Sequence, residues 1–528
     1  MDLHTAGHRR GVVAAPHHAA VEAGRAALAE GNALEAMVAM AATIAVVYPH
    51  MTQLGGDGFW LVREPSGRVR ALMAAGRAGA NARRELYRDY ETIPPRGALA
   101  ALTAPGAVAG WILALEAASA HGGRLRLGDL LAPAIAHARE GTIVTRSQAR
   151  FTAEKLAELE DVPGFAPTFL LDGKPPEAGA TLKQAALAAT LDHLAHAGLD
   201  DFYRGDVGRE IAGDLDRVGS PVTRADLEGC RATLAEPLSV ALDAGRAFNT
   251  PPPTQGLASL IILALFERLR IPQGEGFDHI HTLVEATKRA SGVRDRVITD
   301  PDDLPHPVGR YLDAKFLDAE ARTIDRRKAA RRPVPAGEGG TVWMGAADAS
   351  GLVVSYVQSL YWEFGSGVVL PQTGVLMQNR GASFSLQSGA LNSLQPGRLP
   401  LHTLNPALAV LADGRIVGYG AMGGDGQPQT QAAIFTRHVR YRVPLDRAID
   451  APRWLLGRTW GSTQGNLRME ARFDGALVDR LLSAGHDVEM LAEPYSDVMG
   501  HAGVVALHPD GTCEGVHDPR ADGGAAGV

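Results

Sequence analysis

The chain has 528 residues, of which 45% are hydrophobic and 21% charged, a composition typical of a globular protein with a large core. Its formal net charge of -7 at pH 7 argues against nucleic acid or an acidic membrane surface as a partner. Its two cysteines, Cys230 and Cys513, support neither a disulfide framework nor a cysteine-based zinc site.

The N-terminal stretch carries His8, Arg9 and Arg10, and no apolar segment of signal-peptide length follows it. The sequence also contains no run of 18 or more uninterrupted apolar residues, so no membrane span is expected. These observations predict a cytoplasmic protein.

The first two thirds of the chain read as helix-rich. The helix expected at 33–47 has Glu35 as its only charge and small residues on nearly every face, which predicts close packing inside the protein. A charged, mostly helical surface region is expected at 77–96. Further helices are predicted at 19–30, 112–120, 127–140, 152–156, 182–197, 209–218, 257–269 and 279–291.

After residue 340 the pattern becomes strand-rich. The turn-forming residues 348–351 lie between two apolar segments, 342–347 and 352–359, and this order predicts a β-hairpin. Other strands are predicted at 59–63, 368–370, 375–378, 407–411, 415–421 and 504–508, and helices at 429–439 and 475–484.

Two local features invite a binding interpretation that the sequence does not support. The glycine cluster at 54–58 precedes a strand and lacks a following Gly-Lys-Ser/Thr, so it is read as a tight turn rather than a phosphate-binding loop. His279 and His281 stand two positions apart on a predicted helix and do not share a face. No metal site is therefore predicted.

The boundary between the two halves has an order of residues that suits self-cleavage. A stretch containing Pro333, Pro335, Gly337 and Gly339 leads into Gly340-Thr341, where an apolar strand begins. The hypothesis is that the Gly340-Thr341 bond is cut and that Thr341 becomes a new N-terminus. The plain structural alternative is a loop entering a strand that starts with threonine, a β-favoured residue.

An N-terminal threonine carries both parts that an amide hydrolase needs, because its α-amino group can take the proton from its own hydroxyl. The sequence has no Gly-x-Ser-x-Gly motif, so a nucleophile-elbow serine hydrolase is not indicated. Gly423-Gly424, after a predicted strand, offers backbone N–H groups for an oxyanion. A plain turn is the alternative interpretation of this glycine pair.

Several blocks along almost the whole chain resemble the γ-glutamyltransferase family of N-terminal-nucleophile hydrolases. The matching blocks, in chain order, are 31–33, 54–59, 105–111, 251–256, 281–285, 300–301, 364–367, 423–424 and 518–520. The resemblance implies a proenzyme cut before Thr341 into a large subunit, 1–340, and a small subunit, 341–528. It also implies an α/β four-layer α/β/β/α sandwich built by both segments, with no metal and no organic cofactor.

Carried over by position, the resemblance makes Thr341 the nucleophile and Gly423 and Gly424 the oxyanion-hole glycines. Ser359 takes the place of a threonine that hydrogen-bonds the nucleophile and aids processing. A homodimer of the two-subunit unit is left open, because the sequence does not settle the oligomeric state.

The substrate pocket departs from the family pattern. The arginine that holds the substrate α-carboxylate in γ-glutamyl enzymes is replaced by Ala75, and the aspartate that holds the α-amino group by Ser383. The remaining replacements are Tyr361, Arg380, His402 and Thr403. An arginine suits a carboxylate ligand, although a salt bridge within the fold is the alternative role for Arg380.

This variant pattern is similar to the branch of the family that contains oxamate amidohydrolase, which implies cleavage of oxamate to oxalate and ammonia in purine breakdown. A γ-glutamyltransferase or glutathione hydrolase and a cephalosporin-acylase-like amidase are the enzyme alternatives. An uncleaved homologue that acts as a binding protein is the alternative without catalysis.

Overall fold

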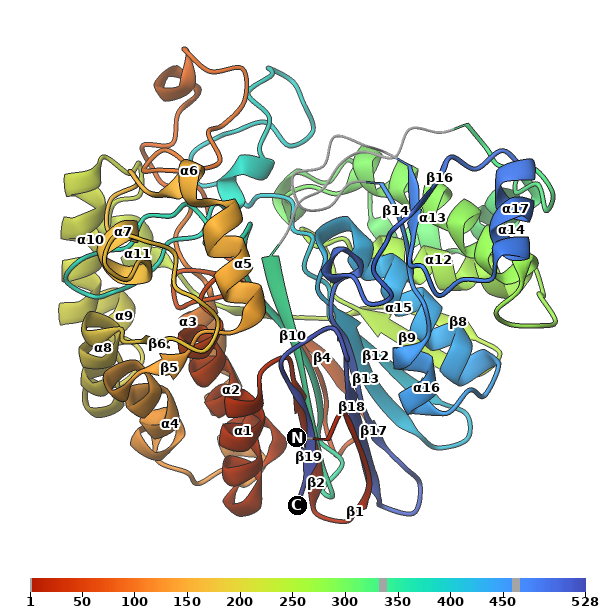
Figure 1. Ribbon diagram of the computed structural model, residues 1–528, viewed down its shortest axis with the longest axis horizontal. Coiled ribbons are helices and arrows are strands. Elements are labelled where there is room, and N and C mark those ends of the chain that lie inside the picture. The colour runs from red at the N-terminus through yellow and green to blue at the C-terminus, as the bar shows by residue number, and fades with distance from the viewer. Residues whose placement is uncertain (1, 332–339, 458–465) are drawn as a thin grey trace.

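The computed structural model describes residues 2–331, 340–457 and 466–528. Two seven-stranded antiparallel sheets lie face to face at the centre of the molecule, and helices cover the outer face of each (Figure 1). The N- and C-termini lie close together at one end of the sheets (Figure 1). The architecture is therefore the predicted α/β/β/α sandwich.

The first sheet has neighbouring strands from both sides of Gly340. Its order is β19 (Gly524–Gly527), β2 (Gly11–Ala15), β10 (Gly340–Asp348), β11 (Val353–Tyr361), β3 (Asp57–Arg63), β4 (Val69–Ala74) and β7 (Thr233–Ala235). The hairpin β10–β11 lies between β2 and β3, which come from the start of the chain. A cut at residue 340 would therefore leave the two segments joined by strand pairing.

The second sheet is also built from distant parts of the chain. Its order is β1 (His4–His8), β18 (Cys513–His517), β17 (Ala502–Leu507), β13 (Ile416–Ala421), β12 (Ala407–Leu411), β9 (Gly245–Asn249) and β8 (Leu238–Leu242). Here β12 pairs with β9 and thereby joins residues on either side of Gly340.

Apolar residues fill three layers, one between the sheets and one beneath each group of helices. Trp343 and Val357 lie between the sheets, whereas Val342 and Met344 face the first helical layer. This alternation follows from the two-residue period of a strand. Every residue of β10 and β11 is buried, which explains their nearly continuous apolar sequence.

The helices over the first sheet include α2 (Ala33–Val47), whose residues are all buried. Asn32 caps this helix by accepting hydrogen bonds from the backbone N–H groups of Leu34 and Glu35, and the Glu35 carboxylate accepts one from Asn32 N at 2.9 Å. The other helices in this half are α1 (His18–Glu30), α3 (Ala107–Ala120), α4 (Leu127–Glu140), α5 (Arg146–Glu154), α6 (Leu156–Leu159), α7 (Phe165–Phe169), α8 (Ala185–Ala197), α9 (Asp201–Arg204), α10 (Asp206–Val218) and α11 (Arg224–Gly229).

In the second helical layer, α12 and α15 pack against the other sheet, and α13 packs on both of these helices. Its helices are α12 (Gly256–Arg268), α13 (Phe277–Val297), α14 (Ala314–Arg322), α15 (Gln427–Phe435), α16 (Leu445–Asp450) and α17 (Gly475–Ser483). Smaller sheets consist of β14 (Trp454–Leu456), β15 (Leu467–Met469) and β16 (Val488–Met490), and of β5 (Thr142–Ile143) and β6 (Thr181–Leu182). Within the described ranges, no helix combines the length and the apolar character needed to cross a membrane.

Three local predictions are corrected by the structure. The region 77–96 is mainly irregular, with one short 3-10 turn at Arg84–Tyr87, because Ala78 N and Gly79 N bond to distant loop carbonyls instead of helical ones. The strands predicted at 368–370 and 375–378 reduce to a single bridge between Val369 and Leu376. The helix predicted at 152–156 is interrupted at Lys155, where α5 ends and α6 begins.

The stretch expected to lead into the Gly340-Thr341 bond lies outside the described residues; it contains Pro333, Pro335, Gly337 and Gly339.

Candidate active site

The hairpin β10–β11 places Thr341 at the buried start of β10. Thr341 is fully buried, and its Oγ1 donates a hydrogen bond to Ser359 Oγ at 3.2 Å. The Ser359 hydroxyl in turn donates to the carbonyl oxygen of Gly340 and accepts from the backbone N–H of Tyr361 at 2.7 Å. One hydroxyl therefore contacts both the candidate nucleophile and the carbonyl of the bond that precedes it.

The backbone around this contact is irregular. The pairing of β10 with β11 shifts register between Gly340 and Val342, and Tyr361, which pairs with Gly340, has φ of +84°. A left-handed conformation is uncommon for a bulky aromatic residue, and such strain is often found at functional sites. The irregularity coincides with the bond that the sequence nominates for cleavage.

Asp57, on the neighbouring strand β3, extends the polar cluster from Ser359. It pairs directly with Ser359 across the sheet. Its Oδ1 accepts hydrogen bonds from the backbone N–H groups of Gly76 at 3.0 Å and Gly106 at 2.9 Å, and its Oδ2 lies 2.9 Å from His402 Nε2. From the sequence, Asp57 was expected to belong to a turn; its one available signal was a charged residue at the entrance to an apolar strand.

Arg380 adjoins this cluster through Tyr361 and is buried. Its guanidinium stacks on the Tyr361 ring, 3.6 Å from the ring centroid, and Nη2 donates to Thr403 Oγ1 at 3.2 Å. Burial lowers the pKa of Arg380 to about 10. Among the described residues, no carboxylate lies within ion-pair distance of the Arg380 guanidinium. These residues therefore do not form the salt bridge that was the alternative role for Arg380.

Ser383, one turn after Arg380, donates its hydroxyl to the carbonyl of Leu401 at 3.2 Å. The Arg380 Nη1 atom lies 3.5 Å from the same carbonyl. The segment that carries His402 and Thr403 is thereby connected to the turn that carries Arg380 and Ser383. All of the substrate-binding residues nominated from the sequence belong to this one connected region.

The Gly423-Gly424 turn reaches the same end of the sandwich. On β13, a Cβ atom added at Gly418 would contact Val353, which lies at the turn end of the hairpin β10–β11. A Cβ atom added at Gly420 would contact Trp343, two residues after Thr341. The strand β13 therefore runs toward Thr341. Gly423 and Gly424 follow the end of this strand with φ of +114° and +52°. Both conformations favour glycine.

A buried polar network anchors this turn to the pocket. The Gln255 side-chain amide donates to the carbonyls of Thr403 at 2.6 Å and Gly424 at 2.8 Å. Arg294 donates to Gln255 Oε1 at 2.8 Å and forms a bidentate pair with Asp425. Burial alone would lower the pKa of Arg294, but Asp425 and other acidic contacts outweigh it and raise that pKa. No role was predicted from the sequence for Gln255 or Arg294.

A buried histidine cluster lies in the other half of the fold. His281 Nδ1 is 2.8 Å from His486 Nε2, and these atoms lie with a Glu285 carboxylate oxygen within 4.8 Å of one another. Lys288 donates to Glu285 at 2.7 Å, and both side chains bond the backbone of Ala330. The sequence predicted no partner for His281. We interpret the group as an anchor for the chain just before residue 332.

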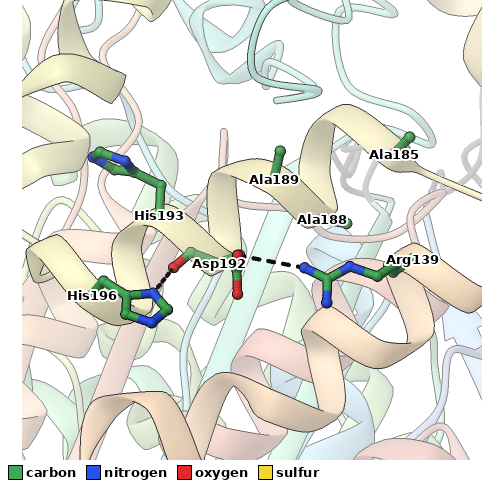
Figure 2. Close-up of a pocket in the computed structure, with 7 residues that line it drawn as sticks. All are labelled: Arg139, Ala185, Ala188, Ala189, Asp192, His193 and His196. Atoms are coloured by element: carbon green, nitrogen blue, oxygen red, sulfur yellow. Dashed lines mark hydrogen bonds and ion pairs between the residues drawn. The ribbon is translucent and has the colours of Figure 1, made fainter.

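A separate surface hollow of about 590 Å³ lies on α8 and α4 (Figure 2). Arg139 approaches Asp192 to 3.5 Å there, and His196 Nδ1 lies 2.7 Å from the Asp192 carbonyl (Figure 2). Its seven lining residues include neither a hydroxyl nor a thiol. This hollow therefore offers no nucleophile of these two kinds, and Thr341 remains the candidate nucleophile.

Comparison with known proteins places the whole chain in one family. Residues 20–528 match the family model described as gamma-glutamyltranspeptidase. The oxamate amidohydrolase proenzyme of Klebsiella pneumoniae is 50% identical over 519 residues, covering 98% of each chain. The glutathione hydrolase-like YwrD proenzyme of Bacillus subtilis is 38% identical over 521 residues, again covering 98% of each.

A solved structure, the cephalosporin acylase from Bacillus halodurans, is similar in fold, with a TM-score of 0.90 and 30% sequence identity. The match covers 99% of this chain and 97% of that one. The chain belongs to the gamma-glutamyltranspeptidase family and is a self-processing N-terminal-nucleophile amidase.

Proposed function

We propose that the chain cuts itself between Gly340 and Thr341 and that the product hydrolyses oxamate to oxalate and ammonia. The cut divides the chain into segments 1–340 and 341–528, with Thr341 as the new N-terminus. The contacts of Ser359 with Gly340 O and Thr341 Oγ1 support the position of the cut.

In the cleavage step, Thr341 Oγ attacks the carbonyl carbon of Gly340 and the C–N bond between the two residues breaks. The Gly340 acyl group moves to the hydroxyl oxygen, and the freed α-amino group takes up a proton. Water then hydrolyses the ester. Negative charge develops on the Gly340 carbonyl oxygen during attack, and Ser359 already donates a hydrogen bond to this atom.

In the mature enzyme, the α-amino group of Thr341 is the base for its own hydroxyl. Attack on a substrate amide gives an acyl-enzyme and releases ammonia, and water then releases the acid. The backbone N–H groups of Gly423 and Gly424 would bind the oxyanion, a role for which their glycine conformations leave space. Gln255 holds the position of this turn through Gly424.

The substrate proposal rests on one observation above all: Arg380 is buried against Tyr361 without a carboxylate partner among the described residues. A buried cation calls for a compensating anion, and a planar guanidinium matches a substrate carboxylate. Ala75 and Ser383 replace the two groups that recognise glutamate in γ-glutamyl enzymes. The 50% identity to an oxamate amidohydrolase proenzyme supports the same substrate and a place in purine breakdown.

The test combines a denaturing gel with product release from four amides: ammonia from oxamate and glutamine, the aniline from a γ-glutamyl anilide, and the free amine from a cephalosporin-type amide. We expect two bands for the purified protein, a single band for Thr341→Ala, and the highest kcat/KM on oxamate. Turnover of the γ-glutamyl anilide at a rate similar to that of oxamate would overturn the substrate proposal. A single band for the active wild-type protein would overturn the cleavage proposal.

A further inference from the structure

Two buried polar atoms in the substrate region have no hydrogen-bond partner among the described residues. They are His402 Nδ1 and Arg380 Nε, and each side chain is 1% exposed. An unpaired buried polar atom costs free energy, so such atoms in a binding site indicate partners supplied by a ligand. Arg380 Nε is a donor, whereas His402 Nδ1 is a donor or an acceptor according to the tautomer of the ring.

The surroundings of Asp57 determine that tautomer. The Asp57 carboxylate accepts two backbone hydrogen bonds at Oδ1, and its Oδ2 lies 2.9 Å from His402 Nε2. A carboxylate oxygen accepts, so Nε2 must carry the hydrogen. Burial, reinforced by the charge of Arg380, lowers the pKa of His402 to about 4, so the ring is neutral near pH 7. His402 Nδ1 is consequently an acceptor with an unused lone pair.

We infer that His402 Nδ1 accepts a hydrogen bond from the NH₂ group of the substrate while Arg380 binds its carboxylate. This inference rests on the proposed function and adds a specificity determinant to it: an acceptor beside a cation selects an amide next to a carboxylate. Phe59 fixes the imidazole ring from the edge, at 4.7 Å between centroids. An ester or a second carboxylate has no hydrogen to offer Nδ1 and leaves it unpaired.

The same contact assists departure of the nitrogen. After attack by Thr341, the nitrogen of the tetrahedral intermediate has two hydrogens and a lone pair. A bond from one hydrogen to His402 Nδ1 leaves the lone pair free to take a proton from the α-ammonium group of Thr341. The C–N bond then breaks with its electron pair on nitrogen, ammonia departs, and the acyl-enzyme carbonyl reforms. His402 remains neutral throughout.

The substitution Asp57→Asn reverses the hydrogen-bond polarity with little change in shape. The asparagine Oδ1 retains the two backbone bonds, so its Nδ2 faces His402 and donates to Nε2. The ring must then carry its hydrogen on Nδ1, where it opposes the substrate NH₂. The assay measures kcat/KM for oxamate and for the methyl half-ester of oxalic acid, which has the same carboxylate and no N–H. Wild-type protein and the variant are compared after each is confirmed as two bands on a denaturing gel.

We expect Asp57→Asn to lower the amide-to-ester ratio of kcat/KM by about 10- to 100-fold, the range for losing one buried hydrogen bond. Equal losses on both substrates would overturn the inference, because a general structural defect lowers both. Failure of the wild-type protein on oxamate would instead refute the proposed function, which separates the two outcomes.

A second pair of variants decides the matter if Asp57→Asn does not mature. His402→Asn keeps an acceptor oxygen near the Nδ1 position, whereas His402→Leu removes it. We expect His402→Asn to retain most of the preference for the amide and His402→Leu to lose it. The same ratio for both variants would overturn the inference.

Discussion

Removal of the Ser359 hydroxyl tests the self-cleavage geometry directly. In Ser359→Ala, Gly340 O loses its side-chain donor, Thr341 Oγ1 loses its acceptor, and Tyr361 N loses its acceptor. The methyl group that remains fills almost the same space. The strand register and the apolar packing of β11 should therefore persist.

The decrease in cleavage rate depends on whether the hydrogen bond to Gly340 O stabilises the charge that develops during attack or only the folded chain. If Ser359 stabilises charge that develops on this oxygen, its loss slows cleavage by about 100- to 1,000-fold, as for an oxyanion donor. If the bond is merely structural, its net value of about 1 kcal/mol corresponds to a change of about fivefold. The two interpretations differ by more than a factor of ten.

The assay follows conversion of freshly synthesised chain into two bands on a denaturing gel over time. Ser355→Ala is the matched control: Ser355 is buried on the same strand and face, and its hydroxyl bonds Trp343 Nε1 and Tyr419 O instead. We expect the control to cleave near the wild-type rate if it folds. Equal rates for Ser359→Ala and Ser355→Ala would refute the reasoning.

Three further predictions concern the mature site. Replacement of Arg380 by Met should raise KM for a carboxylate-bearing amide by about 10- to 100-fold through loss of a charged hydrogen bond, measured by ammonia release; an unchanged KM would exclude Arg380 as the carboxylate ligand. Gly423→Ala places a side chain at φ of +114° and should lower kcat, whereas Gly389→Ala, at φ of +77° in open space, should not; equal kcat values would argue against a role for the turn. For His402, the folded chain has a pKa of about 4 and the unfolded chain about 6.5, so stability falls as pH decreases through this window. His402→Gln should remove about 2 kcal/mol of the stability loss between about pH 7 and pH 5 in urea unfolding, and an identical loss in both proteins would contradict the assignment.

Long elements were predictable because their signals are local. The helices at Ala33–Val47 and Leu127–Glu140 have the predicted bounds, since apolar period and capping residues act within one element. The hairpin around residues 348–351 was predicted for the same reason. Short strands such as β8 and β19 were missed, because their pairing partners supply the order that a few residues cannot encode alone.

The order Gly340-Thr341 followed by an apolar strand suggested an N-terminal threonine nucleophile, but a loop entering a strand explained this stretch equally simply until the matching blocks along the chain were considered. The family match covers residues 20–528. The residues that surround Thr341 could not be predicted in the same way. Asp57 and His402 are 345 positions apart in the chain and 2.9 Å apart in space, and Gln255 joins Thr403 to Gly424 across three separate segments. Such contacts arise when two sheets pack face to face and bring distant loops to one end, so they depend on the tertiary fold rather than on any local pattern.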